Sequence, residues 1–266
     1  MFPRLFEIGS FGLPTYGVLV ALGVLVGLWI SVRNSARQGI KPENAWDFGI
    51  AVVLAGIVGS KLLYILVDWH TYAEHPGEIF SLATLQAGGV FSGGLIASFI
   101  VAAWFLRKHH MPALATCDAF SPGLAMGHAI GRLGCFAAGC CWGKETHLPW
   151  AVTFHNPQAW ALTGVPLETP LHPSQLYEFA TEALLFGYLM WRFGKPHEPG
   201  KIIGLYLVVS SVIRFLIEFT RFHEQALPFG LPLSITQWIA IGVALAGGLL
   251  LLRPTGAARI SKPVPA

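Results

Sequence analysis

The sequence predicts an all-α membrane protein with about seven transmembrane helices and a small extracytoplasmic head between spans 4 and 5. Of its 266 residues, 54% are hydrophobic and 12% are charged, and the mean hydropathy is +0.58. Because soluble domains carry about 25% charged residues, this composition argues against a soluble enzyme and against a disordered chain. The apolar residues form continuous runs of about 20, the length that a helix needs to cross a bilayer, rather than the alternating pattern of barrel strands.

Seven apolar runs follow one another along the chain. They cover residues 14–30, 46–67, 88–106, 115–139, 174–193, 202–219 and 233–252. No internal repeat is evident, which argues against a transporter built from inverted repeats. The first 14 residues lack a basic segment followed by an apolar run and a cleavage site, so we expect no removable signal peptide.

The distribution of Lys and Arg predicts the orientation in the membrane. Eleven of the 17 lie in loops of one side, three lie on the other side, and Lys61, Arg132 and Arg214 lie inside spans. Since basic loops stay in the cytoplasm, we expect an extracytoplasmic amino terminus and a cytoplasmic carboxyl terminus. The net charge of +3 is too small and dispersed for nucleic-acid binding. The connection 142–173 is long for a loop without function, and we interpret it as an extracytoplasmic head or lid.

The fourth span contains Arg132, with His128 four residues earlier on the same helix face. A charge at the centre of a span costs about 2.5–3.5 kcal/mol, so it needs a partner or a function. Gly123, Gly127 and Gly131 recur at every fourth position and allow a neighbouring helix to approach closely. The alternative to a functional Arg132 is a packing face from which this arginine reaches outward.

The sixth span carries Arg214, Glu218 and Arg221 as one polar stripe. One interpretation is a neutral Arg214–Glu218 pair that only holds helices together. The other is a path that leads an anionic group to Arg214. Two arginines on separate helices suit a phosphodiester, because guanidinium groups match phosphate oxygens in geometry and stay protonated.

The starts of two further spans are unusual. The third begins with Gly88-Gly89-Val90-Phe91-Ser92-Gly93-Gly94, which favours either backbone contact with a ligand or close helix packing. The fifth begins with His172-Pro-Ser-Gln-Leu-Tyr-Glu178, where we expect Ser174 to be the N-cap. Glu178 and Glu182 then form a polar pair in an apolar helix.

The four cysteines are Cys117, Cys135, Cys140 and Cys141. Their irregular spacing predicts neither a disulfide framework nor a zinc site, and we interpret them mainly as small packing residues, with redox sensitivity of Cys140 and Cys141 as the alternative. We expect no metal and no cofactor.

Three of these features together resemble the prolipoprotein diacylglyceryl transferase family: the segment 172–178, Gly131-Arg-Leu-Gly134, and the stripe in the sixth span. Tyr16-Gly17, Lys61 and Tyr64 also look like family positions. The resemblance implies an enzyme of the bacterial inner membrane. It would move the diacylglyceryl group of phosphatidylglycerol onto the lipobox cysteine thiol of a prolipoprotein and release glycerol phosphate. Its partners would be phosphatidylglycerol, prolipoprotein signal peptides and membrane lipids.

The resemblance also implies roles for individual residues. Arg132 and Arg214 would hold the phosphate and stabilise the leaving group, with Tyr16, Gly143 and Glu218 in support. The other expected substrate contacts are Lys61, Tyr64, Ser92, Gly93, Gly94, Ser174, Gln175, Tyr177, Glu178 and Arg221.

The chain departs from the family pattern at four positions. Ser92 replaces the histidine of a Phe-His-Gly-Gly motif, Cys135 an asparagine, Cys140 an acidic residue and Ser210 a tyrosine. The phosphate site is therefore intact, but the proposed base is missing. Either His128 or His172 supplies a base, or the two arginines lower the pKa of the acceptor thiol enough to make one dispensable.

Three alternatives stay open at this point. The chain could be a divergent family member that acts on another acceptor, or an inactive paralogue that binds lipid. From another class, a transporter of an anionic lipid or solute would also place arginines inside spans.

Overall fold

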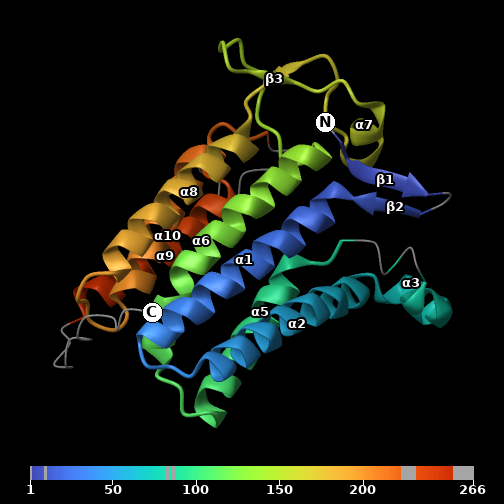
Figure 1. Ribbon diagram of the computed structural model, residues 1–266. Coiled ribbons are helices and arrows are strands. Elements are labelled where there is room, and N and C mark those ends of the chain that lie inside the picture. The colour runs from blue at the N-terminus through green and yellow to red at the C-terminus, as the bar shows by residue number, and fades with distance from the viewer. Residues whose placement is uncertain (1, 9–10, 82–83, 85–87, 223–231, 254–266) are drawn as a thin grey trace. The chain divides into compact units, whose positions relative to one another are not determined.

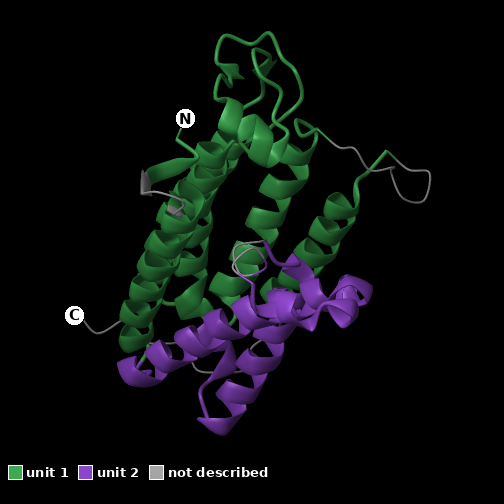
Figure 2. Ribbon diagram, turned by 90° about the vertical axis from the view of Figure 1, so that its right-hand side faces the viewer, with its two compact units in different colours: residues 1–38, 117–266 green, residues 39–116 purple. Residues whose placement is uncertain are grey.

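The computed structural model describes residues 2–8, 11–81, 84, 88–222 and 232–253. These residues are mostly helical, as expected for an all-α protein (Figure 1). Contacts divide the chain into two compact units, of which unit 1 comprises residues 1–38 and 117–266 and unit 2 comprises residues 39–116 (Figure 2).

Unit 1 is built around five long helices. They are α1 (Thr15–Arg37), α6 (Ala113–Ala138, of which residues 117–138 belong here), α8 (Ser174–Phe193), α9 (Lys201–Glu218) and α10 (Ile235–Leu252). A buried apolar cluster joins α6, α8 and α9 through Ala119, Leu185, Leu189, Phe193 and Ile202. This cluster fixes the three helices that carry the charged residues of the spans.

Glycines bring α1 and α6 into backbone contact. A Cβ added to Gly27 would lie 2.7 Å from the carbonyl oxygen of Gly123, and one added to Gly23 would lie 2.8 Å from that of Gly127. Only glycine allows this approach, so Gly123 and Gly127 of the repeat form a packing face, as their spacing predicts, whereas a Cβ on Gly131 would meet no atom within 4 Å.

Residues 142–173 form a small ordered body. Strands β3 (Val152–Thr153) and β4 (Pro170–Leu171) pair antiparallel, and between them lies α7 (Pro157–Thr163), whose N-cap is the Asn156 side chain. Phe154, Ala159, Val165 and Leu171 are its own buried core. At the amino terminus, β1 (Arg4–Ile8) and β2 (Phe11–Pro14) form an antiparallel hairpin that leads into α1.

Unit 2 contains α2 (Pro42–Val67), α3 (Trp69–Glu74), the 3₁₀ helix η1 (Pro76–Phe80) and α5 (Phe91–Lys108). A Cβ on Gly94 of α5 would lie 2.7 Å from the carbonyl oxygen of Gly56 of α2, and one on Gly93 would lie 2.5 Å from that of Gly59. The glycine-rich start of the third predicted span therefore serves helix packing.

Within the described residues, four helices are long and apolar enough to cross a membrane: α1, α2, α5 and α10. The chain is thus a multi-pass membrane protein. The bounds of α8 match the predicted fifth span, whereas α1 continues past the predicted end at residue 30 to Arg37. The prediction of Ser174 as the N-cap of α8 is wrong, because Pro173 holds that position and Ser174 is the first helical residue.

Candidate active site

Glu178 lies at the centre of a cluster of charged side chains in unit 1. Its carboxylate contacts Nε of Arg132 through Oε2, and its Oε1 lies 2.8 Å from Nη1 of Arg214 and 3.5 Å from Nη1 of Arg221. The Glu178 side chain is 2% exposed. Three guanidinium groups from separate segments therefore converge on one buried carboxylate.

Helix periodicity and packing place these side chains. Glu178 lies in the second turn of α8, Arg132 in α6 and Arg214 in α9. Arg221 follows the end of α9, where it forms a β-bridge with Gly143, and the neighbouring Lys144 N–H donates to the carbonyl of Thr220 at 2.8 Å. The base of the head thus holds the backbone of Arg221 in position.

Two further carboxylates balance the arginines. Glu218 Oε2 lies 2.6 Å from Nη2 of Arg214, and its Oε1 accepts a hydrogen bond of 2.8 Å from Ser234 Oγ. Glu182 Oε1 accepts a hydrogen bond of 2.8 Å from Ser210 Oγ. Three arginines and three glutamates give a neutral group when His128 is neutral, which is the pairing that buried charges require.

His128 lies between cations and anions. Its Nε2 accepts a hydrogen bond of 3.1 Å from Nε of Arg132, so the proton of the neutral ring belongs on Nδ1, which lies 3.4 Å from Glu182 Oε1. Nε2 also lies 3.6 Å from Glu178 Oε2. Sequence spacing identified Arg132 as its neighbour but not the two carboxylates, because these come from another helix.

His172 belongs to the base of the head. Its Nδ1 lies 3.2 Å from the hydroxyl of Tyr177, which accepts a hydrogen bond of 2.7 Å from Trp150 Nε1. The carbonyl of His172 accepts from the N–H of Gly143 at 3.0 Å. A Cβ on Gly143 would lie 2.6 Å from Ser174 Oγ, so this crossing requires glycine.

Other predicted site residues of unit 1 connect α8 to its neighbours. Ser174 Oγ lies 3.1 Å from Thr220 Oγ1, and Gln175 Nε2 donates to the carbonyl of Cys140 at 2.6 Å. Tyr16 packs beside Gly134, where an added Cβ would lie 3.2 Å from its ring. These contacts hold the first turn of α8 next to the chain segments that carry Arg132 and Arg221.

Five predicted residues lie in unit 2. Lys61 Nζ donates to the carbonyl of Thr84 at 2.7 Å and lies 5.8 Å from the ring centroid of Tyr64. Ser92, Gly93 and Gly94 form the first turn of α5, with Ser92 exposed. That these residues face the same substrate as Arg132 stays a prediction.

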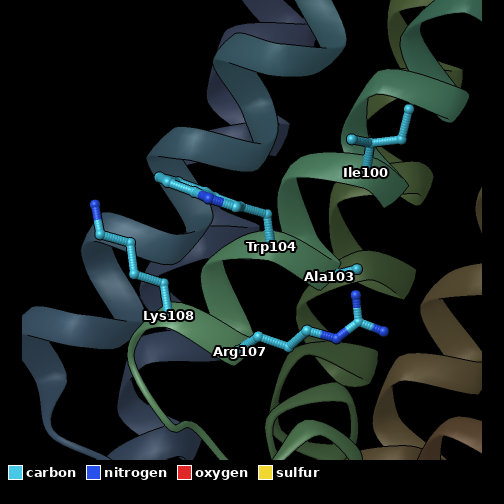
Figure 3. Close-up of a pocket in the computed structure, with 5 residues that line it drawn as sticks. All are labelled: Ile100, Ala103, Trp104, Arg107 and Lys108. Atoms are coloured by element: carbon cyan, nitrogen blue, oxygen red, sulfur yellow. The ribbon is translucent and has the colours of Figure 1, made fainter.

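A cavity of about 610 Å³ lies on α5 (Figure 3). It is lined by Ile100, Ala103, Trp104, Arg107 and Lys108. The ammonium group of Lys108 lies 4.6 Å from the ring centroid of Trp104. Aromatic and basic side chains at a helix end are typical of a membrane–water interface, and this cavity contains none of the predicted site residues.

Sequence reasoning missed two features of the site. Ser234, which binds Glu218, is recognisable in the sequence only as the start of a capping box with Gln237 before the last apolar run. The sulfur atoms of Cys135, Cys140 and Cys141 lie within 4.8 Å of one another, although their spacing is not that of a metal site.

Comparison with known proteins identifies the family of the chain. Residues 3–253 match the family model described as prolipoprotein diacylglyceryl transferase. A phosphatidylglycerol–prolipoprotein diacylglyceryl transferase of Clostridium tetani is 34% identical over 221 residues, which cover 83% of this chain and 86% of that protein. Proteins of the same name from Vibrio cholerae and Methylobacillus flagellatus are 32% and 33% identical, and each alignment covers 94% of this chain. These alignments cover 90% of the Vibrio cholerae protein and 95% of the Methylobacillus flagellatus protein.

Proposed function

This chain belongs to the prolipoprotein diacylglyceryl transferase family, and we propose that it transfers the diacylglyceryl group of phosphatidylglycerol to the cysteine thiol of a prolipoprotein. It is a transferase that acts in lipoprotein maturation. The observation that carries the assignment of the site is the convergence of Arg132, Arg214 and Arg221 on Glu178.

The exposed fractions of the charged side chains support binding of an anion. Arg132, Arg214 and Arg221 are 19%, 22% and 16% exposed, whereas Glu178 and Glu218 are 2% and 3% exposed. An approaching lipid headgroup therefore meets the cations and not the carboxylates. Glu178 holds the guanidinium groups in place, while their remaining N–H groups bind the phosphate.

The reaction displaces a phosphate group at a glycerol carbon. The acceptor sulfur forms a bond to that carbon, the carbon–oxygen bond breaks, and the phosphate oxygen keeps the electron pair. Arg132 and Arg214 stabilise the charge that develops on this oxygen. The thiol proton passes to a base, and we assign this role to Nε2 of His128 rather than to His172, because His128 lies within the charged cluster whereas His172 bonds to Tyr177. To take the proton, Nε2 must release the hydrogen bond that it accepts from Nε of Arg132.

We also propose seven spans in the bacterial inner membrane. Besides the four apolar helices, α6, α8 and α9 have 26, 20 and 18 residues, or roughly 27–39 Å at 1.5 Å per residue. Their charged side chains pair with one another, as charges inside a membrane must. In this topology the amino terminus and the head 142–173 are extracytoplasmic, the carboxyl terminus is cytoplasmic, and residues 1–266 form one polytopic membrane domain.

A transfer assay tests the function. The full-length protein in detergent is mixed with phosphatidylglycerol and a lipobox peptide, and mass spectrometry detects the thioether-linked diacylglycerol. The wild type should form this product, and Arg132→Ala or Arg214→Ala should lower the rate by about 10²-fold or more. Lysine should rescue poorly, because Arg214 uses two nitrogens on two carboxylates.

Arg192→Ala is the matched control, because this half-buried arginine near the end of α8 hydrogen-bonds only to the carbonyl of Pro196 among the described residues. It should retain the wild-type rate. Absence of thioether product from the wild-type protein would overturn the function. A wild-type transfer rate for either alanine variant would show that the substituted arginine has no role in the proposed reaction.

A further inference from the structure

Three thiols meet at the end of α6. The sulfur atoms of Cys135, Cys140 and Cys141 all lie within 4.8 Å of one another, and none of the three is in a disulfide. Cys135 is buried, and the other two are half-buried. This group adjoins the arginine–glutamate cluster through Cys135, whose sulfur lies 3.9 Å from Nη1 of Arg132, but it has no part in the mechanism described above.

The backbone after α6 is bent so that these thiols converge. Gly139 has φ +79°, and the N–H of Cys140 donates to the carbonyl of Cys135 at 3.1 Å. The buried Gln175 holds the carbonyl of Cys140 at 2.6 Å. Cys141 has φ +61°, a left-handed conformation that is unfavourable for a residue other than glycine and is concentrated at functional sites. The cluster is therefore preorganised by contacts from α8.

The three converging sulfur atoms match the donor set of a metal site. Zinc–sulfur bonds of about 2.3 Å in a tetrahedral site place sulfur atoms about 3.8 Å apart, a separation within the limit observed here. A disulfide would use two of the thiols and leave the third unexplained. Three protein ligands are the number found in catalytic zinc sites, where the fourth position is open.

The surrounding charges suit such a complex. Three thiolates and one divalent cation carry a net charge of −1, and Nη1 of Arg132 lies 3.9 Å from the sulfur of Cys135.

We propose that Cys135, Cys140 and Cys141 bind one zinc ion, and that its open position takes the acceptor thiol of the prolipoprotein. The second half of this proposal rests on the proposed function. His128, Arg132 and Cys135 are spaced i, i+4 and i+7 on one face of α6, so a thiol on the metal lies beside the arginine that binds phosphate.

A thiol that coordinates zinc is deprotonated, and here its proton passes to His128. The sulfur then forms its bond to the glycerol carbon, the carbon–oxygen bond breaks with its electron pair on the phosphate, and the thioether product leaves the metal. This arrangement gives the chain a means of activating the acceptor although Ser92 occupies the position of the family histidine.

Cobalt provides the first test, because thiolate-to-cobalt charge transfer is visible in the absorption spectrum. The full-length protein in detergent is reduced, stripped with a chelator and titrated with Co²⁺. We expect one equivalent to bind with a charge-transfer band that Zn²⁺ abolishes. Cys135→Ser, Cys140→Ser and Cys141→Ser should each weaken binding about tenfold or more, whereas Cys117→Ser should bind like the wild type.

A missing band, or a band that the three variants do not change, would overturn the metal site. A thiol titration of the unreduced, metal-free protein addresses the disulfide. Four reactive thiols are expected, and two would show that a disulfide forms instead.

The open position is tested without catalysis. Adding a lipobox peptide to the cobalt-loaded protein, with no lipid present, should intensify the charge-transfer band, and the same peptide with serine in place of its cysteine should not. An unchanged band would overturn the assignment of the fourth position and leave the three-thiolate site. If the cobalt spectra behave as expected but phosphatidylglycerol yields no thioether product, the proposed function fails and the metal site stands.

Discussion

Glu178 accepts contacts from three guanidinium groups while its side chain is almost completely buried. A single carboxylate in this position determines the spacing of the arginines, because each must approach one of its two oxygens. The neighbouring carboxylates of Glu182 and Glu218 each accept a hydrogen bond from a serine hydroxyl, which restricts their movement. At the scale of residues, Glu178 is therefore the positioning group of the proposed phosphate site.

Replacement of Glu178 by glutamine tests this role. Glu178→Gln keeps the shape but removes the counter-ion of three partly buried cations, and breaking a buried pair costs about 3–5 kcal/mol. We expect a lower unfolding midpoint in detergent and loss of transfer. Glu168→Gln is the control, since that exposed side chain forms a surface pair with His155 that contributes about 1 kcal/mol or less. Equal midpoints for the two variants would contradict the positioning role.

Local spacing predicted part of the site and tertiary packing determined the rest. The Arg214–Glu218 pair follows from an i, i+4 spacing and is confirmed. The meeting of Arg132 with Glu178 depends on how α6 packs against α8, which periodicity within either helix cannot show. The thiol cluster was missed for a related reason, because the left-handed turn at Gly139 and Cys141 places residues of irregular spacing together.

At the scale of elements, hydropathy predicts the ends of some helices and misses the ends of others. The bounds of α8 match the predicted span, although the run from Ser174 to Phe193 contains Glu178, Glu182 and Arg192. Hydropathy ended α1 too early, because the helix continues through two arginines that interrupt the apolar pattern. Arg33 lies over the ring of Trp29 at 5.6 Å and so continues the helix surface without an apolar side chain. A charged residue interrupts an apolar run in the sequence, but it does not by itself end a helix.

The contact between α1 and α6 gives a prediction about packing. Gly27→Ala places a methyl group 2.7 Å from the carbonyl oxygen of Gly123, so the helices must separate. We expect a loss of about 1–3 kcal/mol in the free energy of unfolding, and slower transfer because α6 carries Arg132. Gly187→Ala is the control, since its added Cβ would meet no atom within 4 Å and alanine favours the helix. A Gly27→Ala protein as stable as this control would show that the contact is dispensable.

The connection between α8 and α9 gives a prediction about pH. His197 donates through Nδ1 to the carbonyl of Lys195 at 2.8 Å, and its Nε2 lies 3.3 Å from Gln38 Nε2. Burial, reinforced by the Arg192 cation, lowers the pKa of His197 below its ordinary value of 6.5, against the effect of the Lys195 carbonyl. The unfolded chain then binds a proton more readily than the folded protein. The stability contributed by neutral His197 is present above about pH 6.5 and is lost as the pH falls toward the lower, folded pKa.

His197→Asn should therefore reduce the fall in unfolding midpoint between about pH 7 and pH 5, measured in detergent. His155→Gln is the control, because that histidine is exposed and lies in the head. Its variant should keep the wild-type pH dependence of the midpoint. If His197→Asn keeps the full pH dependence as well, the contact between the end of α1 and the α8–α9 connection does not sense pH.

At the scale of the whole molecule, the site and the topology constrain each other. Backbone hydrogen bonds near Gly143 join the base of the head to the segment that carries Arg221, so the arginine cluster lies at the end of unit 1 that carries the head. A prolipoprotein presents its cysteine at the extracytoplasmic face after export. The proposed reaction therefore requires an extracytoplasmic head, which is the side that the loop charges predict.

Cysteine labelling tests this orientation. Glu168→Cys introduces an exposed thiol in the head, and Lys108→Cys introduces one at the end of α5, on the predicted cytoplasmic side. A membrane-impermeant maleimide applied to intact cells should label Glu168→Cys above the wild-type background set by the four native cysteines. Lys108→Cys should be labelled only after the cells are opened. If Lys108→Cys alone were labelled in intact cells, the topology would be the reverse of the one proposed. The head and the arginine cluster would then lie on the cytoplasmic side, where an exported acceptor could not reach them.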